Sequence, residues 1–510
     1  MPNRVATPEG AQLKDFQTRR PFSTTAGYSR LELLLLAVLV LALLCRFIAR
    51  PYAPFWIDEA ATGSILAEDT YADFIRDVRW HVSSPLYFVF LREWSHIFGL
   101  SNFALRFPSA LFSIAAPLVI LLYPVNGMGR LERLNWAALV ALWIPGVGFG
   151  QAARPYALEM LFATAQTVAF ARLLSNASLR STSIWVGLSA LTISTHYLAA
   201  PLALVQGLIF LTLHRWEAVK QWPALLLLLP AIVLVAWQAP EMFRFMQPGT
   251  TWYRVYGLRQ VNASLDYLIG SHIAEAGLGI LLAVAGWTRL KRKGADDFRP
   301  GLLLWVGGAS AIGAAILIAA ATQRPMMTDR YLVPFAPGFL LLIPMLLRKL
   351  AKSSAAWAAT ATIVPFALGL LLWLALGARH PDSVVEELNY EHASHDIMRS
   401  GVKSVVFLWD NPNSQAMHLE QIKEYGRFFF KRARYDIEVI PARPNPQGDS
   451  NPLLLNAAQP KRSAILWVYD NWVLQTTTRL HPPRIDKIDQ SWACSTRRKK
   501  KIGIVTCLPR

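Results

Sequence analysis

Two adjacent carboxylates, Asp58 and Glu59, follow the first long apolar segment of the chain, in the string Phe55-Trp56-Ile57-Asp58-Glu59-Ala60. A carboxylate held beside an apolar surface can act as a general base, and a neighbouring carboxylate can shift its pKa or position a substrate. Trp56 is of a residue type that favours membrane interfaces. The structural alternative is that both acids simply begin a helix, where negative charge is also favoured.

A histidine precedes a proline-marked helix start in the string His81-Val82-Ser83-Ser84-Pro85-Leu86-Tyr87. Ser84 suits a helix cap and Pro85 suits the first turn, so most of the string has a structural explanation. His81 is not needed for that purpose. It is therefore a candidate to contact a phosphate or an acceptor.

Arginines at the ends of apolar segments form a third group of candidates: Arg106, Arg154, Arg324 and Arg330. Arg154 stands in Gln151-Ala152-Ala153-Arg154-Pro155-Tyr156, and the last two lie within the range 323–331, which ends in Asp329-Arg330-Tyr331. The planar, permanently charged guanidinium suits bidentate phosphate binding, and arginines from different helices could converge on one headgroup. The alternative is that these side chains reach toward lipid headgroups without a substrate.

The composition places these groups in a membrane protein. Hydrophobic residues make up 54% of the 510 and charged residues only 16%, and the mean hydropathy is +0.31, which a soluble surface does not allow. In a membrane protein, a net charge of +18 is explained by basic residues in cytoplasmic loops and next to anionic lipid. We therefore do not expect nucleic acid as a partner. Three cysteines exclude a disulfide-built scaffold and leave no cysteine cluster for a metal.

A bilayer core requires about 20 mostly apolar residues per helix. This criterion predicts eleven transmembrane helices, of which the first is an uncleaved anchor with a cytoplasmic N-terminal segment before it. The predicted spans are 31–49, 102–122, 135–150, 155–174, 182–198, 200–214, 223–239, 273–288, 301–321, 332–348 and 356–377.

One further apolar stretch, 85–100, is predicted to lie in the interface and not to span. Arg92 and Glu93 stand near its middle, and placing both at the bilayer centre would cost several kcal/mol. With this stretch excluded, the basic loops all fall on the N-terminal side, as the positive-inside rule requires. The large loop 50–101 and the C-terminal tail then lie on the outer face.

The predicted organisation has three parts: a cytoplasmic segment 1–30, a transmembrane domain 31–378 with the outer loop 50–101, and an extracytoplasmic domain 379–510. In the last part, strand-like runs at 404–408, 437–440 and 464–468 alternate with a helical stretch near 414–431, which predicts a small α/β domain. Cys494 and Cys507 flank a basic turn. The sequence leaves open whether they are bonded.

Ionisable groups are nearly absent from the middle of the predicted spans, and Glu159 near one end is the closest exception. Ion-coupled transporters usually need such groups at the midplane. This pattern counts against a transporter and concentrates the candidate chemistry at the outer helix ends.

Taken in order, these motifs resemble the polytopic GT-C glycosyltransferases. The Asp-Glu pair, His81-x-x-Ser84-Pro85-Leu86-Tyr87, Ala104-Leu105-Arg106-Phe107-Pro108, Ala153-Arg154-Pro155-Tyr156-Ala157-Leu158 and Arg330-Tyr331-Leu332-Val333-Pro334 are similar to the bacterial relatives of protein O-mannosyltransferases and of the lipid A aminoarabinose transferase, grouped as glycosyltransferase family 39. The resemblance covers roughly residues 30 to 350. Ser84-Pro85 departs from the two prolines that are common after the histidine in that family.

The resemblance implies transfer of a sugar from a polyprenyl phosphate carrier to an acceptor hydroxyl, with inversion, at the outer face of a bacterial inner membrane. Asp58 would be the catalytic base and Glu59 its partner in the motif. The residues implied to bind substrate are His81, Tyr87, Arg106, Arg154, Tyr156, Arg324, Arg330 and Tyr331.

No cofactor is required by this chemistry, although Asp58 and Glu59 could recruit a divalent ion. The expected partners are the lipid-linked sugar donor and a lipid, glycan or protein acceptor. A transporter or flippase, and a polymerase or ligase, for a polyprenyl-linked glycan are the alternative functions. The sugar, the acceptor and the role of the C-terminal domain are not predicted.

Overall fold

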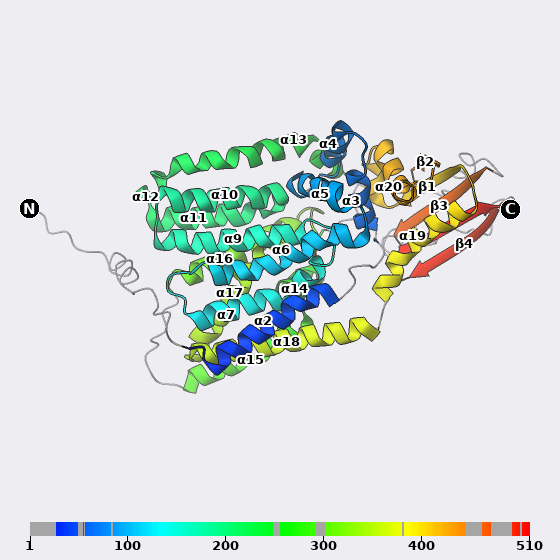
Figure 1. Ribbon diagram of the computed structural model, residues 1–510. Coiled ribbons are helices and arrows are strands. Elements are labelled where there is room, and N and C mark those ends of the chain that lie inside the picture. The colour runs from blue at the N-terminus through cyan, green and yellow to red at the C-terminus, as the bar shows by residue number, and fades with distance from the viewer. Residues whose placement is uncertain are drawn as a thin grey trace, which may run out of the picture.

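The computed structural model describes residues 27–48, 55, 57–82, 85–247, 255–291, 301–379, 382–443, 462–470, 492–499 and 502–510. Long helices form one bundle, and a smaller domain built around a sheet lies at one end of it (Figure 1). The predicted fold class, a helical polytopic membrane protein with a small C-terminal α/β domain, is confirmed.

Each predicted span coincides with a helix or with a pair of helices in the bundle. They are α2 (Arg30–Ile48), α6 (Asn102–Leu122), α7 (Arg130–Leu142) with α8 (Ile144–Phe149), α9 (Tyr156–Ser175), α10 (Leu179–Thr195), α11 (Ala200–His214), η2 (Trp222–Leu228) with α13 (Leu229–Phe245), α15 (His272–Lys291), α16 (Leu303–Ala321), η3 (Asp329–Phe335) with α17 (Ala336–Ala351), and α18 (Ala355–Arg379). Short helices η1 (Tyr197–Ala199) and α12 (Trp216–Val219) flank α11.

Among the described residues, seven of these helical segments are long and apolar enough to cross a membrane. An eighth is added if α14 (Leu258–Ile269) and α15, which meet at an 87° bend, together form one broken span. Helices α7 and α10 are 13 and 17 residues long, which is shorter than the roughly 20 residues that a bilayer core requires. Length and composition therefore support seven or eight of the eleven predicted spans.

Helices α16 and α17 pack closely because small residues line their contact. A Cβ atom added to Gly338 would lie 2.0 Å from Ser310 Oγ, and one added to Gly307 would lie 2.8 Å from Leu342 Cβ. Glycine thus allows the two backbones to approach, as small residues do at membrane helix interfaces. This packing fixes α17, and η3 leads directly into α17.

The described residues of the outer loop form three short helices, α3 (Ile57–Leu66), α4 (Tyr71–Trp80) and α5 (Pro85–Phe98). Pro85 begins α5 as predicted, whereas Ser84 and Trp56 lie outside the described residues. Helix α5 has 14 residues and is not among the helices that could span a membrane. Arg92 of α5 is buried, and its Nη2 donates to Glu68 O at 3.1 Å. Its positive charge therefore stabilises the backbone carbonyls at the C-terminal end of α3.

In its described residues, the C-terminal domain contains a sheet with the strand order β2-β1-β3-β5-β4, two α-helices and one short 3-10 helix. Strand β1 pairs in parallel with β2 and β3, and β5 pairs antiparallel with β3 and β4. The elements are α19 (Asp382–Arg399), β1 (Ser404–Asp410), η4 (Pro412–Gln415), α20 (Leu419–Arg432), β2 (Glu438–Ala442), β3 (Ser463–Asp470), β4 (Trp492–Lys499) and β5 (Ile502–Pro509). The three predicted strands and the predicted helix near 414–431 are present.

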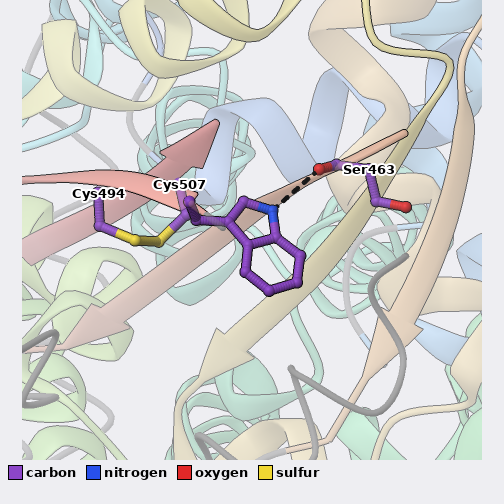
Figure 2. Close-up of a disulfide and its surroundings, with 4 residues drawn as sticks. Ser463, Cys494 and Cys507 are labelled. Atoms are coloured by element: carbon purple, nitrogen blue, oxygen red, sulfur yellow. Dashed lines mark hydrogen bonds between the residues drawn. A yellow bond between two sulfur atoms is a disulfide. The ribbon is translucent and has the colours of Figure 1, made fainter. Parts of the chain in front are cut away.

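Cys494 and Cys507 face each other across β4 and β5 and form a disulfide with an S–S distance of 2.05 Å (Figure 2). The indole nitrogen of Trp492 donates to Ser463 O at 3.2 Å, shown as the dashed line in Figure 2. The disulfide closes the final hairpin. It answers the question, left open by the sequence, of whether these two cysteines are bonded.

The C-terminal domain packs directly on α3. A Cβ atom on Gly63 of α3 would lie 2.3 Å from the ring of Phe428, so only glycine lets α20 approach this closely. Phe55, just before α3, stacks on Phe428 with ring centroids 6.1 Å apart. Helices α3, α4 and α5 lie at the end of the bundle that meets the sheet domain (Figure 1). The domain therefore supports the helix that carries Asp58 and Glu59.

Candidate active site

Asp58 and Glu59 occupy the first turn of α3, where acidic residues are favoured. Because successive side chains on a helix point in different directions, the two carboxylates enter different environments. The side chain of Asp58 is 23% exposed, whereas that of Glu59 is 1% exposed. The pair that looks equivalent in sequence is therefore divided by the fold.

Glu59 binds three elements together in the interior. Arg106 of α6 donates from Nε to Glu59 Oε1 at 2.8 Å and from Nη2 to Oε2 at 2.5 Å. The backbone N–H of Ala153, in the turn before α9, donates to Oε1 at 2.7 Å. This bidentate, buried pair satisfies the charge of Glu59 and locks α3 onto α6 and α9. Arg106, predicted to bind phosphate, is instead engaged by Glu59.

Asp58 lies between two other predicted arginines. Arg330 of η3 donates from Nη1 to Asp58 Oδ2 at 2.9 Å, and Arg154 Nη2 lies 4.0 Å from the same oxygen. Arg154 is fixed by α3 itself, since its Nη1 donates to Asp58 O at 3.1 Å and to Thr62 Oγ1 at 3.3 Å. Both ion pairs use Oδ2, and within the described part of the chain no bond uses Oδ1.

The two guanidinium groups set the charge state of Asp58. Burial acts to raise the pKa of Asp58, but the positive charges of Arg154 and Arg330 outweigh burial, so this pKa lies below the ordinary value of 3.8. Asp58 is therefore ionised at neutral pH.

His81 lies within electrostatic range of the same three groups. Burial, and then the charge of Arg154, lower the pKa of His81 to about 3. Its ring makes an edge contact with Phe88 at a centroid distance of 5.2 Å. His81 is consequently neutral at pH 7 and can offer a substrate a hydrogen bond but not a positive charge.

Aromatic rings surround Arg330. Its Cζ lies 5.8 Å from the ring centroids of both Tyr156 and Tyr331, and Arg154 Cζ lies 6.0 Å from Tyr156. His196 packs against Tyr331 with centroids 4.6 Å apart. The predicted residues Asp58, His81, Arg154, Tyr156, Arg330 and Tyr331 thus gather in one place.

Two other predicted residues are not brought into this cluster. The Tyr87 hydroxyl lies 3.5 Å from Ser109 Oγ in the buried contact between α5 and α6. Arg324 is exposed in the turn after α16, and among the described residues it forms no ion pair. Tyr87 therefore supports packing, and Arg324 remains apart from Asp58.

A polar network behind Arg330 was not expected from the sequence. Asp329 Oδ1 accepts hydrogen bonds from Ser264 Oγ at 2.9 Å and from the Tyr256 hydroxyl at 3.2 Å. Both donors belong to the range 240–272, which lies between the predicted spans 223–239 and 273–288. Asp329 precedes Arg330, so this network fixes the start of η3. No local motif in 240–272 signals it.

Glu159 lies one helical turn beyond Tyr156 on α9 and is fully buried. Neither of its carboxyl oxygens has a hydrogen-bond partner among the described residues, and the same is true of the Tyr267 hydroxyl. The sequence marked Glu159 only as an ionisable group near a helix end. A buried carboxyl group without a partner is costly, so it marks a site that the fold alone does not explain.

The Asp58–Glu59 pair does not resemble a metal site. Each carboxylate is already bonded to arginine, which leaves little net negative charge to attract a divalent cation. A different group of metal-ligating residue types is assembled elsewhere: Asp266, His272 and Glu275, whose ligand atoms lie within 4.8 Å of one another.

No protein-family model matches the sequence, and no curated protein matches it either. Among solved structures, ArnT from Cupriavidus metallidurans in the apo state aligns with a TM-score of 0.50 and 14% identity, over 93% of this chain and 97% of that chain. ArnT bound to undecaprenyl phosphate aligns with a TM-score of 0.48 and 14% identity, over the same shares of the two chains.

The oligosaccharyltransferase of Archaeoglobus fulgidus in the apo form aligns with a TM-score of 0.45 and 11% identity, over 86% of this chain and 69% of that chain. ArnT is the lipid A aminoarabinose transferase, and both neighbours are glycosyltransferases with the GT-C fold. The full-length likeness to apo ArnT shows that this chain has the GT-C fold, as the sequence motifs predicted. At this identity the likeness concerns the fold alone.

Proposed function

We propose that this protein is an inverting glycosyltransferase that moves a sugar from a polyprenyl phosphate carrier to an acceptor hydroxyl. The observation that carries the proposal is the position of Asp58, whose Oδ2 contacts Arg330 and Arg154 while its Oδ1 has no bond to a described residue. A carboxylate and two cations in contact are the groups that this reaction requires: a base for the acceptor and counter-charges for the leaving phosphate.

The proposed step is a single displacement. The acceptor hydroxyl gives its proton to Asp58, and its oxygen forms a bond to the anomeric carbon of the donor. The bond between that carbon and the phosphate oxygen breaks on the opposite face, and the lipid phosphate leaves with the electron pair. Arg154 and Arg330 stabilise the charge that develops on the phosphate. One displacement inverts the anomeric carbon.

The arginines link donor binding to the strength of the base. In the free protein both guanidinium groups hold the pKa of Asp58 down. An arginine has five N–H donors, so a bound phosphate can share Arg154 and Arg330 with Asp58. Arg154 Nε is buried without a hydrogen-bond partner among the described residues and is available to a phosphate oxygen. Phosphate binding would then raise the basicity of Asp58 when the acceptor needs it.

The other residues of the cluster would position the substrate. The rings of Tyr156 and Tyr331 lie beside Arg330, and neutral His81 would donate or accept a hydrogen bond. The proposal places this site at the outer face of a bacterial inner membrane, with a cytoplasmic N-terminus and a periplasmic C-terminal domain. The acceptor class would be a lipid, a glycan or a protein.

The test is to incubate the purified full-length protein with polyprenyl monophosphate sugars and to measure release of free polyprenyl phosphate. The anomeric configuration of the product, determined by NMR, reports inversion. We expect Arg330→Ala to slow release strongly, and Glu217→Gln, an exposed carboxylate bonded to Lys220, to leave it unchanged. Failure to release polyprenyl phosphate with any such donor, in protein that is folded and active in lipid transport, would favour a flippase instead.

A further inference from the structure

Asp266, His272 and Glu275 form a compact group at the break between α14 and α15. Asp266 lies in the last turn of α14, and the other two lie in the first turn of α15. Gly270 between them adopts a left-handed conformation with φ of 104°, which allows the sharp reversal. The bend therefore brings side chains from two helices onto one point.

The distances in this group are close to those around a bound metal ion. His272 Nδ1 lies 2.8 Å from Asp266 Oδ2 and 3.7 Å from Glu275 Oε2. In a tetrahedral zinc site, neighbouring ligand atoms are separated by about 3.4 Å, given metal–ligand distances of about 2.1 Å. To match this spacing, the distance from His272 to Asp266 must increase slightly and the distance from His272 to Glu275 must decrease slightly. The His272 side chain is 87% exposed, so it can rotate to do both.

A second observation also points to a ligand. The Asp266 side chain is 13% exposed, but its Oδ1 is buried and has no hydrogen-bond partner among the described residues. An ion pair with His272 through Oδ2 does not satisfy this oxygen. A buried carboxylate oxygen left without a partner is costly, whereas a cation held by the carboxylate would satisfy it.

We propose that Asp266, His272 and Glu275 bind one divalent transition metal ion of the zinc class. One imidazole and two carboxylates are a nitrogen and oxygen ligand set that suits Zn²⁺. Three protein ligands leave a fourth position for water. The ion would fix the angle between α14 and α15.

The proposed ion would act on the candidate active site through α14. Ser264, two residues before Asp266, donates to Asp329, and Asp329 precedes Arg330. A metal that fixes α14 would therefore help to hold Arg330 against Asp58. The role is one of positioning, and it does not depend on which reaction Asp58 serves.

The experiment measures metal binding directly. Purified full-length protein is stripped with a chelator and titrated with Zn²⁺ or Co²⁺, and bound metal per chain is determined by elemental analysis. We expect one tightly bound ion and, with Co²⁺, the visible absorption of a four-coordinate site. His272→Ala and Asp266→Asn should each weaken binding at least tenfold (about tenfold to hundredfold is typical even for residues that only support a ligand).

The matched control is His395→Ala, because His395 also lies beside a carboxylate, 3.9 Å from Glu391. This variant should bind metal as the unmodified protein does. Since His272 is exposed, its replacement should leave the thermal unfolding of the metal-free protein unchanged. Equal metal binding by the unmodified protein and His272→Ala would overturn the proposal and identify the group as an ion pair alone.

Discussion

Arg330 Nη1 lies 2.9 Å from Asp58 Oδ2, although the two residues are 272 positions apart in the chain. Arg330 lies in the first turn of the short helix η3, which leads into a bundle helix, and Asp58 lies in the first turn of α3, the first helix of the outer loop. The contact therefore joins the transmembrane bundle to the outer loop at the point where chemistry is proposed. Several measurable consequences depend on it.

Removing Arg330 should change the acid side of the pH–activity profile. Burial favours the protonated form of Asp58, and Arg330 is one of the two arginines that oppose it. In Arg330→Ala the pKa of Asp58 should rise, so the fall of kcat/KM at low pH should begin at a higher pH than in the unmodified protein. Residual activity of Arg330→Ala measured from pH 4 to pH 8 checks this, and Arg330→Lys should restore part of the shift. If kcat/KM of Arg330→Ala fell at the same low pH as in the unmodified protein, the assignment of Asp58 as the general base would be contradicted.

Glu59 and Arg106 should behave as a structural pair. Removing one partner of a buried ion pair leaves an uncompensated charge and costs about 3–5 kcal/mol. Glu59→Gln should therefore lower the unfolding temperature in detergent strongly, as should Arg106→Met. The double variant Glu59→Leu/Arg106→Met should recover part of the loss because no charge is left behind. Single variants of unchanged stability but without activity would instead indicate a role in catalysis.

Glu68 should make stability depend on pH. Burial, with the charges of Glu424 and Asp77, raises the pKa of Glu68 from 4.5 to about 8. The folded protein then keeps this proton up to about pH 8, while the unfolded chain loses it near pH 4.5. Stability should therefore fall as pH rises between these two values.

Glu68→Gln should remove this dependence and raise the unfolding temperature at pH 8 more than at pH 5. Glu217→Gln, an exposed carboxylate, is the matched control and should change neither value. Equal effects of Glu68→Gln at both pH values would show that Glu68 titrates normally.

The buried side chain of Glu159 should destabilise the folded protein. Both carboxyl oxygens are buried without partners in the described part of the chain, and such a group costs about 1–3 kcal/mol. Glu159→Met, which keeps the side-chain length, should raise the unfolding temperature of the substrate-free protein. Glu159→Gln should raise it less, because the amide remains polar. A lower unfolding temperature in Glu159→Met would show that the carboxyl group has a stabilising partner.

The helices were predictable because their signals are local. The span 102–122 matches α6 at both ends, since Ser101 caps its first turn and the apolar run stops at Tyr123. Pro85 likewise marks the start of α5. Periodicity and capping operate within a few residues, so a single sequence contains them.

The pairing of charges was not predictable in the same way. Asp58 and Glu59 look alike in sequence, and only the fold shows that Glu59 is bonded to Arg106 in the interior while Asp58 remains partly exposed. Arg106, Arg154 and Arg330 also look alike in sequence, because each is an arginine near the end of an apolar segment. Which carboxylate each one meets depends on contacts between residues far apart in the chain.

The most direct test of the account is a single-turnover measurement with Asp58→Asn. The variant should bind the polyprenyl phosphate sugar donor, because Arg154 and Arg330 remain. Loss of the base should slow release of polyprenyl phosphate by about 10²- to 10⁴-fold, the usual contribution of general base catalysis. A release rate within about threefold of the unmodified protein would show that Asp58 is not the base and would contradict the proposed mechanism.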